Sequence, residues 1–173
     1  MSFDPATIAF SLGGIRLSGL APLIDGVVPD HAAPETGDDG VTWLLADGSR
    51  FEMRLSGREI RLGLSGFAGT LRLDSLGLRI GSAGNVRQYL RNGYMSWDGS
   101  YFVEPDTARD VVGADPAIAS GYAATALLPR GGEGAVILGF LRHDTYQSRF
   151  RFDFAQGGLA IQVETLLDRK PFS

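Results

Sequence analysis

The sequence predicts an all-β domain with little helix, built as an antiparallel, supersandwich-like β-sandwich. Apolar and charged residues alternate in several short segments, as in strands with one buried and one wet face. Glycine is frequent, with 24 residues among 173, and its scattered positions suit a chain with many tight turns. Strongly apolar segments occur in both halves of the chain, which favours two sheets closing over one core.

The clearest hairpin lies in the first half of the chain. In residues 50–55 the odd positions are apolar, and in residues 59–64 the even positions are apolar. Ser56 and Gly57 lie between the two segments and form a short turn signal. The pattern predicts two antiparallel strands that share one dry face.

Further strands are predicted on both sides of this hairpin. Upstream, residues 41–46 are a strand candidate, and the Asp-Gly pair at 47–48 is a strong signal for a two-residue hairpin turn. Downstream, residues 70–73 and 78–80 are two more strand candidates around a turn that contains Gly77.

The second half of the chain repeats the β pattern. Residues 122–128 and 135–141 flank a run of turn residues at 129–134. The segment 135–141 is apolar on both faces, which predicts a central strand covered on both sides. Residues 146–154 alternate strictly, and with 159–167 they predict another hairpin, unusually rich in Phe.

Three segments are less regular. Residues 85–91 fit either a short turn of helix or a strand. Residues 29–39 and 104–116 are rich in Asp and Pro and are predicted to be polar loops. No segment carries a convincing apolar stripe at helical spacing.

Composition excludes several classes of protein. A formal net charge of -4 and a single lysine argue against a nucleic-acid partner and against a polybasic membrane patch. The absence of cysteine excludes disulfides, thiolate nucleophiles and Cys-based zinc sites. The N-terminus has neither a basic region nor an apolar run, and no apolar stretch is long enough to span a membrane. We therefore expect one cytoplasmic domain.

The chain shows no pattern of an autonomous enzyme. Carboxylates near its most aromatic segment are Asp98, Glu104, Asp106 and Asp110. Glycoside hydrolysis needs two facing carboxylates, but no spacing here specifies a pair, and Asp beside Gly or Pro is ordinary turn chemistry. His31 and His143 match neither metal-ligand spacing nor a catalytic triad. We expect no catalytic residue, no metal and no cofactor.

One segment stands out from generic β-protein sequence. Residues 91–102 combine Trp, two Tyr and Phe with Asn, Ser, Asp and Gly. Sugar binding needs this combination, because the C–H faces of a pyranose stack on aromatic rings while its hydroxyls form directional hydrogen bonds. Gly93 and Gly99 would let the backbone turn tightly. For any single aromatic residue, packing in the core remains the more frequent role.

This segment resembles a known signature. Residues 92–97 read Asn-Gly-Tyr-Met-Ser-Trp, which is similar to the NGYQSWS motif in the N-terminal domain of melibiase-type α-galactosidases. Met95 stands where that family has Gln, and Asp98 where it has Ser, so the two departures leave the substrate open. Residues 121–128 and 134–142 resemble the hairpin that follows the motif, and the likeness covers about two-thirds of the chain.

The resemblance implies a role for the segment. In that family the N-terminal domain is a β-sandwich, and a following (β/α)8 barrel supplies both catalytic Asp residues. The signature loop leans over the sugar pocket of the barrel, so Trp97 inherits a substrate contact, with Tyr94 and Asn92 as weaker candidates. Asp98 and Tyr101 complete the candidate substrate-binding set. No segment resembles the barrel, and we expect this chain to be the accessory domain of a larger glycosidase.

Three functions stay open from the sequence. The first is an accessory sandwich that helps to build a galactoside site, orients a catalytic barrel and assists homo-oligomerisation. The second is a free-standing carbohydrate-binding module, in which the same aromatics form a complete platform. The third is a structural or protein-interaction sandwich with Trp97 in its core.

Overall fold

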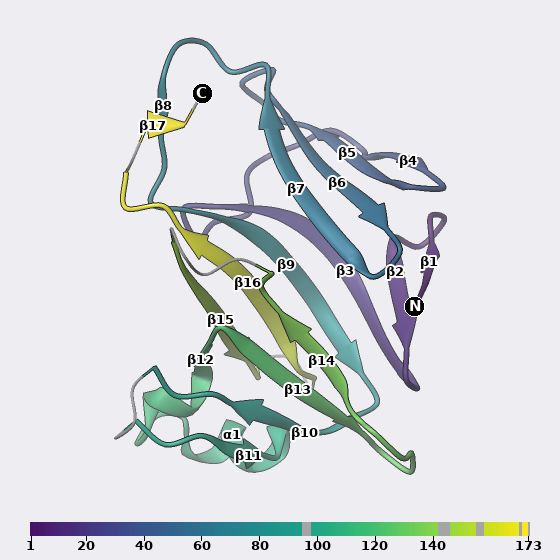
Figure 1. Ribbon diagram of the computed structural model, residues 1–173, viewed down its shortest axis with the longest axis vertical. Coiled ribbons are helices and arrows are strands. Elements are labelled where there is room, and N and C mark those ends of the chain that lie inside the picture. The colour runs from purple at the N-terminus through teal and green to yellow at the C-terminus, as the bar shows by residue number, and fades with distance from the viewer. Residues whose placement is uncertain (95–97, 142–145, 155–157, 170, 173) are drawn as a thin grey trace.

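The structure is a computed structural model that describes residues 1–94, 98–141, 146–154, 158–169 and 171–172. Strands dominate, and antiparallel sheets pack against each other around one hydrophobic core (Figure 1). The predicted all-β sandwich with little helix is confirmed.

The largest layer is a seven-stranded antiparallel sheet. Its strands, in spatial order, are β1 (Ser2–Asp4), β2 (Ala9–Leu12), β3 (Ile15–Ile24), β9 (Ser75–Gly84), β16 (Ala160–Leu166), β15 (Gln147–Asp153) and β12 (Ser120–Tyr122). The long strands β3 and β9 pair along nearly their whole length. They join N-terminal and C-terminal parts of the chain into one sheet.

Two four-stranded sheets pack on the inner face of this layer. One is β4 (Glu35–Gly37), β5 (Gly40–Leu44), β6 (Arg50–Ser56) and β7 (Glu59–Ser65). The other runs in the order β11 (Tyr101–Val103), β10 (Val86–Arg91), β13 (Ala124–Pro129) and β14 (Val136–Gly139). The remaining elements are the pair β8 (Leu71–Arg72) and β17 (Pro171–Phe172), the helix α1 (Pro105–Val111) and the 3₁₀ helix η1 (Pro116–Ala119).

All three main sheets contribute to the core. In the β4–β7 sheet, the rings of Trp43 and Phe51 meet edge-on at 5.8 Å. In the other small sheet, the Tyr89 ring lies 4.2 Å from that of Phe152 on the large sheet. The buried Tyr89 hydroxyl donates to the carbonyl of Ile118 at 2.7 Å, which satisfies its polar end.

The alternating segments fold as predicted. β6 and β7 form an antiparallel hairpin, and Gly57 in its turn has a φ of +62°. β15 and β16 form the Phe-rich hairpin, with Phe150 and Phe152 buried. Residues 85–91, which fitted helix or strand, lie mainly in the strand β10.

The prediction of a central strand at 135–141 is wrong. β14 lies at the edge of its sheet, paired only with β13. Its Ile137 side chain is 73% exposed, and Leu141 beyond it is 77% exposed. In this strand, the apolar residues on one face are buried or partly buried, and those on the other face are exposed to solvent.

Two predicted turns differ from the structure. Gly77 lies inside β9, where an added Cβ would overlap the Val163 carbonyl of the neighbouring strand, so close backbone packing explains this glycine. The Asp-Gly pair at 47–48 belongs to a five-residue connection, because Leu44 pairs with Arg50. There the Asp47 side chain accepts from the backbone N–H and the hydroxyl of Ser49.

The predicted polar loops contain short elements. β4 lies within 29–39, and α1 lies within 104–116, with Pro105 at its first turn. The first 24 residues, in which no strand was predicted, form β1, β2 and β3. None of the helices that the structure describes is both long and apolar enough to cross a membrane.

Candidate functional site

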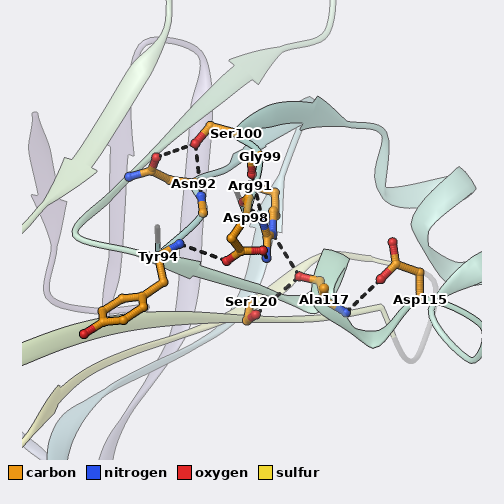
Figure 2. A network of polar contacts seen from close by, with 10 residues as sticks. Arg91, Asn92, Tyr94, Asp98, Gly99, Ser100, Asp115, Ala117 and Ser120 are labelled. Atoms are coloured by element: carbon orange, nitrogen blue, oxygen red, sulfur yellow. Dashed lines mark hydrogen bonds and ion pairs between the residues drawn. The ribbon is translucent and has the colours of Figure 1, made fainter. Parts of the chain in front are cut away.

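The candidate segment is the connection between two neighbouring strands. It links β10 to β11, and its described residues 92–94 and 98–100 lie beside η1 and the start of β12 (Figure 2). Met95, Ser96 and Trp97 lie outside the described residues, so the expected role of Trp97 stays a prediction. The base of the loop, on both sides of this gap, is fully described.

A buried arginine organises the base of the loop. The Arg91 side chain is 3% exposed, and its Nη2 lies 2.6 Å from Oδ1 of Asp98. Its Nε donates to the carbonyl of Ala117 at 3.1 Å, and its Nη1 donates to the carbonyls of Asp98 and Gly99, the latter at 2.7 Å (Figure 2). One planar guanidinium thus ties both ends of the loop to η1.

Asp98 completes this anchor. Its second carboxylate oxygen accepts the backbone N–H of Tyr94 at 2.9 Å. This N–H and the hydrogen bond from Arg91 hold the pKa of the Asp98 carboxyl below its ordinary value of 3.8. The Asp98 carboxylate, a predicted substrate contact, therefore holds the loop together in the structure by binding Arg91 and the backbone of Tyr94.

The side chain of Asn92 also holds the base of the loop in place. Its amide nitrogen donates to the carbonyl of Tyr122 at 2.7 Å, and its amide oxygen accepts the Ser100 hydroxyl at 2.9 Å. The Ser100 oxygen in turn accepts the backbone N–H of Gly93 at 3.0 Å. An added Cβ at Gly93 would overlap the carbonyl of Asp98, so this position requires glycine.

The two described tyrosines of the candidate set remain accessible. Tyr94 is 47% exposed, its ring lies 5.0 Å from that of Tyr122, and its hydroxyl accepts from Nε2 of Gln147 at 2.5 Å. Tyr101 is 42% exposed, and Arg91 Cζ lies 5.8 Å from its ring centroid. The loop thus presents aromatic surface beside a fixed polar base.

Sequence reasoning missed three residues of this arrangement. Arg91 looks like any charged strand residue in the sequence, and nothing local indicates that it is buried. Tyr122 and Gln147 reach the loop from β12 and β15, so only the fold brings them to Tyr94.

Two of the acidic residues nearby are held in ion pairs. Asp98 is committed to Arg91, and Asp106 forms ion pairs with Arg109 and Arg130. Within the described ranges, no three Asp, Glu or His side chains lie close enough to hold a metal ion.

A scan against protein-family models, a search of curated proteins and a search of solved structures each found no match.

Proposed function

We propose that this chain is a non-catalytic carbohydrate-contact domain, in which residues 92–101 form part of a sugar site. In the form closest to the resemblance, it is the N-terminal accessory sandwich of an α-galactosidase-like glycoside hydrolase. The sugar hydrolysis then belongs to a partner barrel, and the loop supplies aromatic surface to the pocket.

One observation carries the proposal: the described base of the loop is held by buried polar contacts, yet Tyr94 and Tyr101 stay accessible. Arg91 is nearly inaccessible and makes four contacts at the base, while Tyr94 and Tyr101 keep 47% and 42% of their surface exposed. Preorganised aromatic faces lose little conformational entropy when a ligand stacks on them. This arrangement favours a loop that binds a ligand over a loop that only connects β10 to β11.

The alternatives differ in how complete the site is. A free-standing binding module would hold its sugar with the loop alone. A structural sandwich would have no sugar affinity, and Trp97→Ala would then cost about 3–5 kcal/mol of stability, as large-to-small core changes do. The accessory domain predicts very weak affinity, because only one wall of the pocket is present.

The test is a titration of galactose and melibiose into the chain, measured by calorimetry, with intrinsic Trp fluorescence as the report on folding. We expect a response that saturates only at high sugar concentration and disappears in Trp97→Ala. Trp43 is 1% exposed and reports folding in the same variant, so a native Trp43 signal separates loss of binding from unfolding. Tight binding by the chain alone would support the free-standing module.

Two results would contradict the proposal. One is the absence of any sugar response at every concentration, for both sugars, in the folded wild-type chain. The other is a response that Trp97→Ala and Tyr94→Ala leave unchanged, since the contact would then lie elsewhere on the molecule.

A further inference from the structure

The outer face of the seven-stranded sheet carries a row of three long polar side chains next to the candidate loop. Arg151 on β15 pairs with Gln162 on β16, and Gln162 pairs with Arg79 on β9. Residues directly opposite on neighbouring strands point to the same face, so the three side chains lie side by side. Phe152, which follows Arg151, and Ile161, which precedes Gln162, point the other way into the core.

Two members of the row lack the partners that their chemistry requires. The amide oxygen of Gln162 is buried and has no hydrogen-bond donor among the described residues. Arg79 is partly buried, and its side chain makes no hydrogen bond or ion pair with any residue that the structure describes. A buried acceptor without a donor is costly, and such atoms mark places where a water or a ligand completes the site.

The neighbouring row leaves positive charge in excess. Glu164 is inaccessible, and its carboxylate accepts from Nη2 of Arg149 at 3.0 Å and from the hydroxyl of Ser75 at 2.9 Å. Arg151 reaches the same carboxylate only at 4.0 Å and is 48% exposed. Arg149 and Arg151 therefore share the Glu164 carboxylate, and Arg79 adds a third positive charge to this face.

The other carboxylates nearby already have partners of their own. Asp25 accepts the backbone N–H groups of Asp74 and Ser75. Asp153 lies on the same face as Arg151, one row further along β15, and is engaged elsewhere. The charges of Arg79 and Arg151 are thus the ones open to an anionic ligand.

The row also lies near the aromatic loop. Tyr122 is opposite Arg149, and Tyr94 packs on Tyr122 at 5.0 Å between ring centroids. Tyr122 and Gln162 lie on strands β12 and β16, with β15 between them, and the register sets them two residues apart along the strands, so they are separated by about 12 Å. That span matches two linked sugar rings.

We propose that this face binds a saccharide that carries a carboxylate, a uronic acid unit, between Arg79 and Arg151, with a sugar hydroxyl donating to the amide oxygen of Gln162. Arginine forks suit planar carboxylates, and a hydroxyl supplies the donor that Gln162 lacks. Inorganic phosphate also carries a hydroxyl, but it lacks the planar carboxylate and the sugar ring that this row would contact. The inference rests on the proposed function in one respect: the second sugar unit is the one that Tyr94 contacts.

The test compares galacturonate and digalacturonate with galactose by calorimetric titration at low salt. We expect both acids to bind more tightly than galactose, digalacturonate most tightly, and inorganic phosphate to compete poorly. Arg79→Gln and Arg151→Gln should each weaken galacturonate binding about tenfold, as expected for one lost charge-assisted hydrogen bond. Gln162→Leu should weaken it as well.

Arg54→Gln is the matched control. Arg54 is a strand residue with a 52% exposed side chain. It lies on β6 of the β4–β7 sheet, whereas the row lies on the seven-stranded sheet. Its replacement should leave affinity unchanged. The inference is overturned if galacturonate binds no better than galactose, if phosphate displaces it with equal affinity, or if Arg54→Gln weakens it as much.

A further variant separates this inference from the proposed function. If Trp97→Ala and Tyr94→Ala leave digalacturonate binding intact while Arg151→Gln weakens it about tenfold, the row is a site and the loop proposal fails. If galactose responds at the loop but the carboxylate adds nothing, the loop proposal stands and the acidic-saccharide site is wrong.

Discussion

The two four-stranded sheets cover the same inner face of the large sheet, yet their outer faces differ sharply. The outer face of the β4–β7 sheet is charged, with Glu52, Arg54 and Arg61 among its residues and ion pairs such as Arg54 to Glu52 at 3.6 Å. The outer face of the β11–β10–β13–β14 sheet is mostly apolar, with Gln88 opposite Leu128 as a polar member. There Phe102 pairs with Leu90, and Ala126 pairs with Ile137.

The difference shows which half of the molecule is suited to meet a partner. Strict alternation of apolar and charged residues produces a sheet with one face packed on the core and one face in contact with water, so its outer face needs no protein partner. The second sheet leaves Phe102 48% and Ile137 73% exposed, on the same sheet that carries the candidate loop. The homo-oligomerisation expected from the sequence would use this face.

The largest effect is expected inside the first sheet. Trp43→Ala removes a side chain that is 1% exposed and should cost about 3–5 kcal/mol in free energy of unfolding. Leu44→Ala, one residue away on the outer face, should change it by less than about 0.5 kcal/mol. Urea denaturation measures both. Equal costs would contradict the assignment of the two faces of β5.

The same measurement sharpens the comparison between the two tryptophans. If Trp97 serves ligand contact, Trp97→Ala should cost less than about 1 kcal/mol, within the range of surface substitutions. A cost similar to that of Trp43→Ala would place Trp97 in the core and favour the structural reading of the domain.

The anchor of the loop should show the next largest effect. Arg91→Met removes the donors to the carbonyls of Ala117 and Gly99, and leaving such acceptors unsatisfied costs roughly 1–3 kcal/mol. Arg54→Met on the charged face should cost far less, since exposed ion pairs contribute little. If both variants are equally stable in urea, the buried guanidinium does not organise the loop.

The apolar outer face should affect association more than stability. Ile137→Lys changes an exposed edge residue, so the free energy of unfolding should shift by less than about 0.5 kcal/mol. Charged edge residues oppose edge-to-edge pairing, so the variant should self-associate less than the wild type in sedimentation velocity at high concentration. A wild-type chain that stays monomeric at every concentration would contradict self-association through this face.

A small pH effect is expected at Asp98. Its pKa is lowered in the folded chain, so its contribution to stability is fully present above the ordinary value of 3.8 and is lost as the pH falls through the lowered pKa. The NMR signals of Gly93 and Ser100 should therefore stay constant down to that value and change only below it. Asp98→Asn should abolish this transition, and a midpoint above 3.8 would contradict the ion pair.

Much of the fold follows from sequence because alternation reports burial directly. The hairpins β6–β7 and β15–β16 were predictable, since each strand has one apolar and one polar side. The position of β14 was not, because an apolar run looks the same whether its second face is covered by protein or left bare. Gly77 was misplaced for a similar reason, since a glycine required by close strand packing looks like a turn residue.

The site could be predicted only in part. The sequence indicated the segment 91–102, because its mixture of aromatic and polar residues is unusual for a strand connection. It could not indicate that Asn92 and Asp98 hold the loop itself, nor that the carboxylate of Glu164 is buried against Arg149. Those facts depend on pairings between residues far apart in the chain.

The most direct test of the carbohydrate-contact loop is to follow the two tryptophan indole N–H signals by NMR while galactose is added to high concentration. Trp43 is buried in the β4–β7 sheet and serves as an internal reference. The account predicts that the Trp97 signal shifts progressively, together with the amides of Gly93 and Ser100, while the Trp43 signal stays fixed. Unchanged signals for both tryptophans, or a shift confined to Trp43, would contradict it.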